Sequence, residues 1–281
     1  MSTTLGPPLA LDGPLPVAPA FGLLSVATIL PPGSDRFGVG AQVWPYPPGL
    51  PTTWDPCSAG TFRTKADGEG WDLPTFQSFT AYLPITCSSM TAHSPGFEDR
   101  VRLAFAATES YAVARELARG SAAPLNPFLA DANLTILAGG AAVTPDVGLS
   151  YLEDAIGATG RGGMILTTPA VGAALNGSGG YGLEVRSGRL VTSANNTPVA
   201  LDGGFIGTSP SLHIALGTGE AWAFATGPIQ VRRSADIEIV PGDIREATDR
   251  SANEVTFRAE RSYLVTWDTA LQAGVLIDWT P

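Results

Sequence analysis

The sequence predicts an α+β fold in which long loops and extended segments join the strands and helices. A two-residue hydrophobic alternation over residues 255–265 is typical of a half-buried strand. Apolar residues at steps of three and four over residues 93–120 are typical of an amphipathic helix. With 44% hydrophobic residues among 281, the chain can bury a sizeable core, and its 33 glycines and 24 prolines predict many turns. This length suggests about two domains.

The charge balance argues against a protein that binds DNA by sequence. The formal net charge is −10, and Lys65 is the only lysine among 16 basic residues. Proteins that wrap phosphates carry a basic stripe, and this sequence has none. The chain also lacks a run of about 18 apolar residues, and its start lacks a basic stretch ahead of an apolar segment. We therefore expect no membrane span and synthesis in the cytoplasm.

Residues 1–50 are predicted to be extended chain. Their many prolines fix φ and remove backbone donors, which leaves room for short edge strands at most. Large apolar side chains, among them Phe21, Leu23, Val43 and Trp44, are unusual in a solvated linker. We interpret the segment as an arm that packs along a neighbouring subunit; the alternative is a flexible tail.

Residues 54–86 predict a long hairpin. Strand-like pieces at 61–63 and 76–86 flank a polar tip that contains the turn signal Asp67–Gly68. An isolated two-stranded hairpin is marginally stable in water, so this one needs a partner surface.

The clearest helix is predicted over residues 93–120. Ser94 can serve as the N-cap with Pro95 at the first helical position, and Gly120 follows as the stop signal. Glu98 and Arg102 are spaced to form an exposed ion pair. The predicted buried stripe consists of Phe97, Val101, Ala104, Phe105, Thr108, Tyr111, Ala112 and Arg115.

The second half of the chain alternates helices with short strands. A helix capped by Thr144, with Pro145 first, is predicted to stop in the sequence GATGRGG. The buried strand MILT follows, and Pro169 begins a short helix that runs through Leu175. Further strands are predicted at 183–185, 189–191, 222–226, 229–233 and 237–240, with a polar loop over 241–252.

Two strands are predicted at the end of the chain. The alternating strand at 255–265 is followed by a short link and by the apolar run 274–277, which has the length of a fully buried strand. From the pattern alone, this is a core hairpin.

The sequence offers few groups for catalysis, cofactors or metals. His93 and His213 have no partner at a recognisable spacing, so each is interpreted as a structural histidine. The glycine-rich stretches GATGRGG and GSGGYG lack the Gly-Lys-Ser/Thr ending of a phosphate loop. Cys57 and Cys87 flank the predicted hairpin, so a bridge across its base and free thiols both stay open; cytoplasmic synthesis favours thiols. We expect no enzyme, no cofactor and no metal.

Several stretches carry a family resemblance in their order along the chain. The sequence AER ahead of an aromatic and aliphatic strand, with a last strand near the C-terminus, resembles the close of Hong Kong 97-type major capsid proteins of tailed bacteriophages. ESYAVARELARG resembles the end of their long spine helix. GMILTTP resembles a segment of their axial domain, and GPIQVRRSADIEI, ahead of the predicted polar loop, also resembles the family. The resemblance covers most of residues 53–279 and involves no invariant motif.

The resemblance implies an α+β, Hong Kong 97-type capsid fold with an N-terminal arm, an extended β-hairpin loop, a peripheral domain with a long spine helix, and an axial domain. The implied boundaries are 1–50 for the arm, 51–92 for the extended loop, 93–126 and 223–262 for the peripheral domain, and 127–222 and 263–281 for the axial domain.

The resemblance also implies a function and partners. A major capsid protein self-assembles into hexamers and pentamers that form the icosahedral head shell around double-stranded DNA, so the chain would be found in the virion. Because about 50 residues precede the extended loop, too few for a built-in scaffolding domain, we expect a separate scaffolding protein, with portal and decoration proteins as further partners. One alternative is an encapsulin-type nanocompartment shell. A second, from another class, is a non-viral α+β enzyme or ligand-binding protein.

Some members of this family crosslink their subunits by an isopeptide bond between a lysine and an asparagine, helped by a buried glutamate. The resemblance maps these roles onto Lys65 near the hairpin tip, Asn253 before the terminal strand, and Glu260 within it. Glu260 aligns with the second of the family's paired acids, and Ala259 occupies the helping position. Asn253 is also one residue out of step, so Lys65 as an ordinary charged loop residue remains the alternative.

Overall fold

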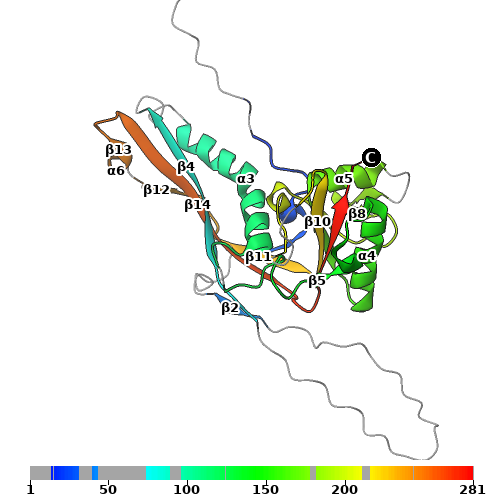
Figure 1. The fold of residues 1–281 in the computed structure, drawn as a ribbon. Helices are drawn as coiled ribbons and strands as arrows, with labels where there is room; N and C mark the ends of the chain where they lie inside the picture. Colours follow the sequence, from blue (N-terminus) through cyan, green and yellow to red (C-terminus); the bar gives the residue numbers. More distant parts are fainter. Residues whose placement is uncertain are drawn as a thin grey trace, which may run out of the picture.

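The computed structural model describes residues 14, 16–31, 40–43, 74–88, 96–123, 125–177, 182–210, 216–242 and 244–280. Most of the predicted N-terminal arm, the first strand of the predicted hairpin and the residues Ser94 and Pro95 lie outside this part. Within it, helices and two larger sheets confirm the α+β class (Figure 1).

The six-stranded sheet is organised around one long strand, β14 (Glu254–Trp267). β4 lies antiparallel along one side of β14, from the pair Ser88–Glu254 to the pair Phe79–Tyr263. β13, β12 and β11 pair with successive parts of the other side. The other strands of this sheet are β1 (Thr28–Leu30), β4 (Phe79–Ser88), β11 (Ile229–Arg233), β12 (Glu238–Val240) and β13 (Thr248–Asp249).

The predicted alternation in β14 is confirmed. Val255, Phe257 and Ala259 are buried, whereas Thr256 and Arg258 between them are exposed. The buried side faces α3 (Phe97–Arg119), whose Phe97 ring lies 5.6 Å from that of Phe257. In Figure 1, β4, β14 and the start of α3 project together from the rest of the molecule. We call β4 with residues 254–263 of β14 the extension.

The five-stranded sheet has the order β5-β15-β10-β6-β9 and forms the body of the molecule. Its central strand β10 sends Trp222 and Phe224 into one hydrophobic cluster and Ala223 and Ala225 into another. The first cluster includes residues of α3, and the second includes residues of α4, so these helices cover opposite faces of the sheet. The strands are β5 (Thr135–Ile136), β6 (Met164–Thr167), β9 (Val199–Leu201), β10 (Glu220–Thr226) and β15 (Gln272–Asp278).

Smaller elements complete the body. The helices are α1 (Leu23–Val26), α4 (Pro145–Ala158), α5 (Pro169–Gly177) and α6 (Ile244–Ala247), with 3-10 turns η2 (Leu137–Gly140) and η3 (Gly203–Phe205). The two-stranded sheets pair β2 (Ala41–Gln42) with β3 (Thr75–Phe76) and β7 (Leu183–Arg186) with β8 (Arg189–Thr192).

The predicted terminal hairpin is wrong. β14 and β15 belong to different sheets, and the link at 268–271 carries the chain from one sheet to the other. β15 pairs instead with β10, which comes earlier in the chain. Two-residue periodicity identifies a strand but not its partner, because partners are selected by side-chain packing across the sheet.

The predicted helix starts later, and its predicted buried stripe is right at Phe97, Val101 and Phe105 but wrong in the second half of the helix. α3 begins at Phe97, with Gly96 in the left-handed conformation at φ 72° as its N-cap. Thr108, Tyr111 and Arg115 are exposed, contrary to the predicted stripe. The buried face instead includes Glu109, Ser110, Val113, Ala114, Glu116 and Leu117. The Glu98–Arg102 ion pair is confirmed, at 3.2 Å.

Other predictions were closer. α4 has Thr144 as its N-cap and buries Leu149, Leu152 and Ile156, as expected. The strand at 229–233 is confirmed without change. The predicted polar loop over 241–252, however, contains α6 and β13. Within the described residues, no helix is both long and apolar enough to cross a membrane.

Candidate functional site

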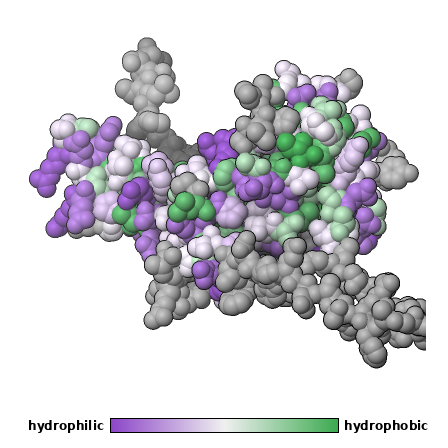
Figure 2. All heavy atoms as spheres, turned by 60° about the horizontal axis from the view of Figure 1, so that its bottom comes forward, coloured by the Kyte–Doolittle hydropathy of each residue, from purple (hydrophilic) through white to green (hydrophobic). Residues whose placement is uncertain are grey.

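The extension presents an exposed polar face on the side away from α3. Tyr82 in β4 is 63% exposed and lies opposite Glu260. Hydroxyl pairs bridge the two strands, with Thr80 and Ser262 at 3.1 Å as one of them. Figure 2 shows that hydrophilic side chains predominate at the extension, whereas apolar side chains gather over the body. Such an exposed, polar face is suited to lie against another protein surface.

A buried ionic cluster joins α3 to the six-stranded sheet. Glu109 of α3 accepts hydrogen bonds from Arg233 (2.5 Å), Arg261 (2.9 Å) and the phenol of Tyr263 (2.7 Å). The side chains of Glu109 and Arg261 are each 10% exposed. Burial, followed by the hydrogen bond to the Glu109 carboxylate, raises the pKa of Tyr263, so its phenol stays protonated and donates. The cluster fixes where the helix lies along the sheet.

Sequence reasoning missed this cluster, although a signal was present. Glu109 lies four residues after Phe105 and four before Val113, so a carboxylate interrupts the apolar face of α3. Its two arginine partners are 124 and 152 residues away in the chain. The interruption could have indicated a buried charge, but its partners could not be identified from spacing.

A second buried carboxylate, Asp202, joins three separate segments. Its Oδ2 accepts from the backbone N–H of Leu23 (3.0 Å) and from the hydroxyl of Ser110 (2.6 Å), and its Oδ1 accepts from the N–H of Gly204 (3.0 Å). Asp202 is only 1% exposed. It therefore ties α1, near the start of the chain, to α3 and to η3.

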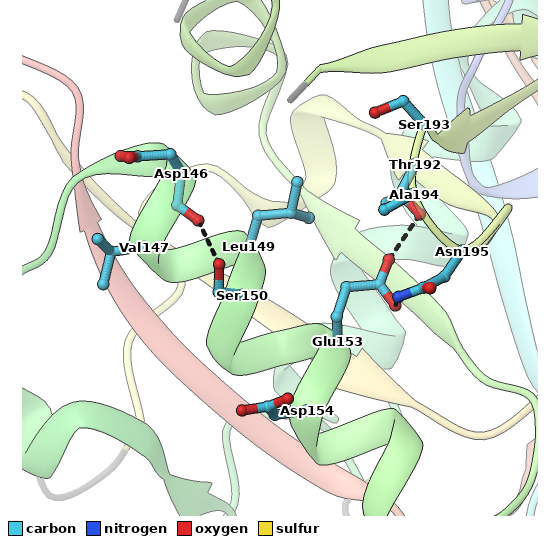
Figure 3. Close-up of a pocket in the computed structure, with 10 residues that line it drawn as sticks. All are labelled: Asp146, Val147, Leu149, Ser150, Glu153, Asp154, Thr192, Ser193, Ala194 and Asn195. Atoms are coloured by element: carbon cyan, nitrogen blue, oxygen red, sulfur yellow. Dashed lines mark hydrogen bonds between the residues drawn. The ribbon is translucent and has the colours of Figure 1, made fainter. Parts of the chain in front are cut away.

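A shallow pocket of about 400 Å³ lies between α4 and the turn after β8 (Figure 3). On its inner side, Glu153 accepts hydrogen bonds from the hydroxyls of Thr192 (2.6 Å) and Thr197 (2.8 Å) and from the amide of Asn195 (3.1 Å). These contacts hold the turn against the helix. None of the ten residues that line the pocket is a histidine, cysteine or lysine.

The structure places two of the three residues of the suggested crosslink. Asn253 lies in a turn at φ 54°, just before β14, and Glu260 lies within β14, opposite Tyr82. Seven residues of strand at about 3.3 Å each separate the two by roughly 23 Å, so one chain does not bring them together. Lys65 lies outside the described residues. The crosslink stays a prediction, and it would need residues from different subunits.

Other candidate residues are only partly described. Cys87 is a free thiol in β4, and burial raises its pKa. The free Cys87 favours the thiol alternative over a bridge; Cys57 lies outside the described residues. His93 and His213 also lie outside them. In the part of the chain that the structure covers, no group of three or more His, Cys, Asp or Glu side chains could hold a metal ion.

No protein-family model and no curated protein sequence matches the chain. Among solved structures, it is similar to a chain of Mycobacterium phage Bobi, at 13% identity and a TM-score of 0.58, covering 99% of this chain and 97% of that one. It is similar to the capsid of an empty GTA particle, at 13% identity and a TM-score of 0.56, covering 99% and 96%. It is also similar to the SrpI encapsulin of Synechococcus elongatus PCC 7942, at 12% identity and a TM-score of 0.55, covering 97% and 92%.

These neighbours are a chain of a phage, the capsid of a GTA particle and an encapsulin, and this chain has the Hong Kong 97-type fold that they share. The resemblance inferred from the sequence is therefore confirmed at the level of the fold.

Proposed function

We propose that this Hong Kong 97-type chain is a major capsid protein that self-assembles into the icosahedral head of a tailed phage. The observation that carries the proposal is the full-length structural likeness to phage capsid chains, which includes the body and the extension. Hexamers and pentamers of the chain would form the shell, and the shell would enclose double-stranded DNA. The net charge of −10 suits a wall that must not adhere to packaged DNA, although solubility explains that charge equally well.

The proposed domains follow the two sheets. The sequence-based division gives residues 93–126 and 223–262 to the peripheral domain, and 127–222 and 263–281 to the axial domain. We assign residues 1–50 to the arm and 51–92 to the extended loop. Within the described part of the arm, Leu23 and Val26 are buried in the core of this same chain, so that part packs on its own subunit and not, as predicted, along a neighbour. The sheets suggest small shifts at two boundaries, because β10 extends to Thr226 within the body sheet and β14 extends to Trp267 within the six-stranded sheet. We therefore place these crossings at 227–228 and 268–271.

Assembly would rely on many modest contacts. The extension offers its exposed polar face to a neighbour, and Tyr82 at its centre has the character of an interface residue. Each contact needs to contribute little free energy, because identical interfaces act together in a closed particle. We propose that a separate scaffolding protein guides this closure, with portal and decoration proteins as later partners.

An encapsulin-type compartment is the second candidate, because the SrpI encapsulin is among the structural neighbours. The two candidates differ in cargo, which is nucleic acid for a phage head and protein for a compartment. The ratio of absorbance at 260 to that at 280 nm of purified particles separates them.

Negative-stain electron microscopy of the full-length chain, with its elution volume on a large-pore column, tests the proposal. We expect rings of five or six subunits or closed shells, formed alone or together with the scaffolding protein. A compact monomer under both conditions would contradict the capsid function. It would favour the enzyme or ligand-binding alternative.

A further inference from the structure

One exposed surface on α3 and η3 combines apolar and basic side chains. Tyr111 is 45% exposed and Ile206 is 60% exposed. The two side chains adjoin, because a Cβ atom added at Gly203 would lie 3.3 Å from the Tyr111 ring and 4.0 Å from Ile206. Arg119 donates to the carbonyl oxygen of Ile206 at 2.8 Å, and the exposed Arg115 follows Tyr111 by one helical turn. We call these four residues the basic surface.

A surface on α4 also combines exposed apolar and aromatic side chains with charged ones, but here the charges are negative. Val147 and Tyr151 are each 41% exposed and lie one turn apart on the helix. Asp146 and Asp154 flank them and are exposed. In Figure 3, Val147 and Asp154 point away from the side on which Glu153 contacts the β8 turn. We call these four residues the acidic surface.

Both surfaces have the features of unoccupied interfaces. Tyrosine and arginine are the residue types enriched at the energetic centres of protein interfaces. Within the described part of the chain, neither the side chain of Arg115 nor that of Asp154 has a hydrogen-bond or ion-pair partner. The two surfaces carry opposite charges, which suits a contact between them.

The two surfaces lie on opposite flanks of the body. α3 packs against the cluster that contains Trp222 and Phe224, and α4 packs against the cluster that contains Ala223 and Ala225, on the other face of the same sheet. Figure 1 shows the two helices on either side of β10. When two different surfaces of one subunit meet head to tail, the contact repeats from copy to copy and closes into a ring if the rotation allows.

We propose that the basic surface of one copy docks on the acidic surface of the next copy, and that this contact builds the ring from which the shell is assembled. The inference rests on the proposed function and names a contact within it. Tyr111 and Ile206 would pack on Val147 and Tyr151, while Arg115 would face Asp154.

Charge reversal in the full-length chain tests the contact under conditions in which the unmodified chain assembles. Arg115→Glu and Asp154→Arg each place like charges together, so each should reduce the yield of rings and shells about tenfold or more. The double variant restores opposite charges and should recover the yield. Arg189→Glu is the matched control, because Arg189 is exposed on β8, outside both surfaces. Circular dichroism and the melting temperature should be unchanged in all four variants.

A disulfide test reports on proximity. Cys57 and Cys87 are first replaced by serine, and Ile206→Cys and Val147→Cys are then introduced on the same chain. After oxidation, non-reducing gel electrophoresis should show disulfide-linked dimers, trimers and larger species, up to the number of subunits in the ring. A mixture of the two single-cysteine chains should stop at dimers. If the unmodified chain assembles while both charge-reversed variants assemble equally well and no ladder forms, the docking contact is wrong and the capsid proposal stands. If the unmodified chain never assembles, even with a scaffolding protein, both proposals fail.

Discussion

Tyr263 donates a hydrogen bond to Glu109 over 2.7 Å, which joins a strand to a helix that lies 154 residues earlier in the chain. The same carboxylate accepts hydrogen bonds from Arg233 and Arg261. The phenol ring also stacks on Phe79, with the ring centroids 5.7 Å apart. Tyr263 thus contacts both α3, through Glu109, and β4, through Phe79.

Glu109→Ala should destabilise the chain by roughly 3–5 kcal/mol, because it leaves the buried Arg261 charge without its carboxylate partner. We expect the lower end of this range, since Arg233 is 32% exposed and can reach water. Glu98→Ala is the control on the same helix, where an exposed ion pair contributes at most about 0.5 kcal/mol. Urea unfolding of both variants checks the difference, and equal effects would contradict a buried cluster.

Stability should fall at alkaline pH because of Tyr263. Its pKa is raised in the folded state by burial and by Glu109. The folded state therefore retains a proton that the unfolded state loses above about pH 10. The stabilisation is complete below that pH and decreases above it by about 1.4 kcal/mol per pH unit. Unfolding curves between pH 8 and 11 should show a shallower decline for Tyr263→Phe than for the unmodified chain; identical slopes would rule out this role.

Asp202→Asn should loosen α1. The substitution replaces an acceptor oxygen by an amide that faces the N–H of Leu23, so a buried donor loses its partner at a cost of about 1–3 kcal/mol. Hydrogen exchange over residues 23–27 should accelerate more than exchange in β10. Asp236→Asn, at an exposed position, serves as the control. Unaltered exchange at α1 would show that other contacts hold the segment.

Two glycines should respond to alanine with opposite signs. A Cβ atom at Gly204 would lie 2.6 Å from the backbone oxygen of Tyr111 and 2.6 Å from the backbone nitrogen of Arg115, so Gly204→Ala should cost about 1–3 kcal/mol. A Cβ atom at Gly157 in α4 would meet nothing within 4 Å, so Gly157→Ala should stabilise the helix by roughly 0.5–1 kcal/mol. Melting temperatures check both, and a neutral result at Gly204 would mean that η3 does not press on α3.

Local patterns identified most elements but not their neighbours. The Pro145 start of α4 and the alternation of Val255 and Phe257 are properties of a few adjacent residues, so they could be read without the fold. β14 pairs with β4 along one side and with β11, β12 and β13 along the other, and β15 pairs with β10 and β5. None of these pairings has a signal in spacing, which is why two adjacent strands were predicted to be a hairpin. The buried face of α3 was misplaced for a related reason, because Glu109 is polar and only its partners make its burial possible.

By itself, the sequence determined the class of fold, the position of most helices and strands, and a resemblance in their order, because periodicity, capping residues and turn residues act over a few positions. The tertiary structure decided which strands pair, which side of α3 is buried, and how Glu109 and Asp202 each join segments far apart in the chain. It also decided that the basic and acidic surfaces lie on opposite flanks of the body. These relations depend on side chains that meet only when the chain folds, and spacing along the sequence does not encode which of them will meet.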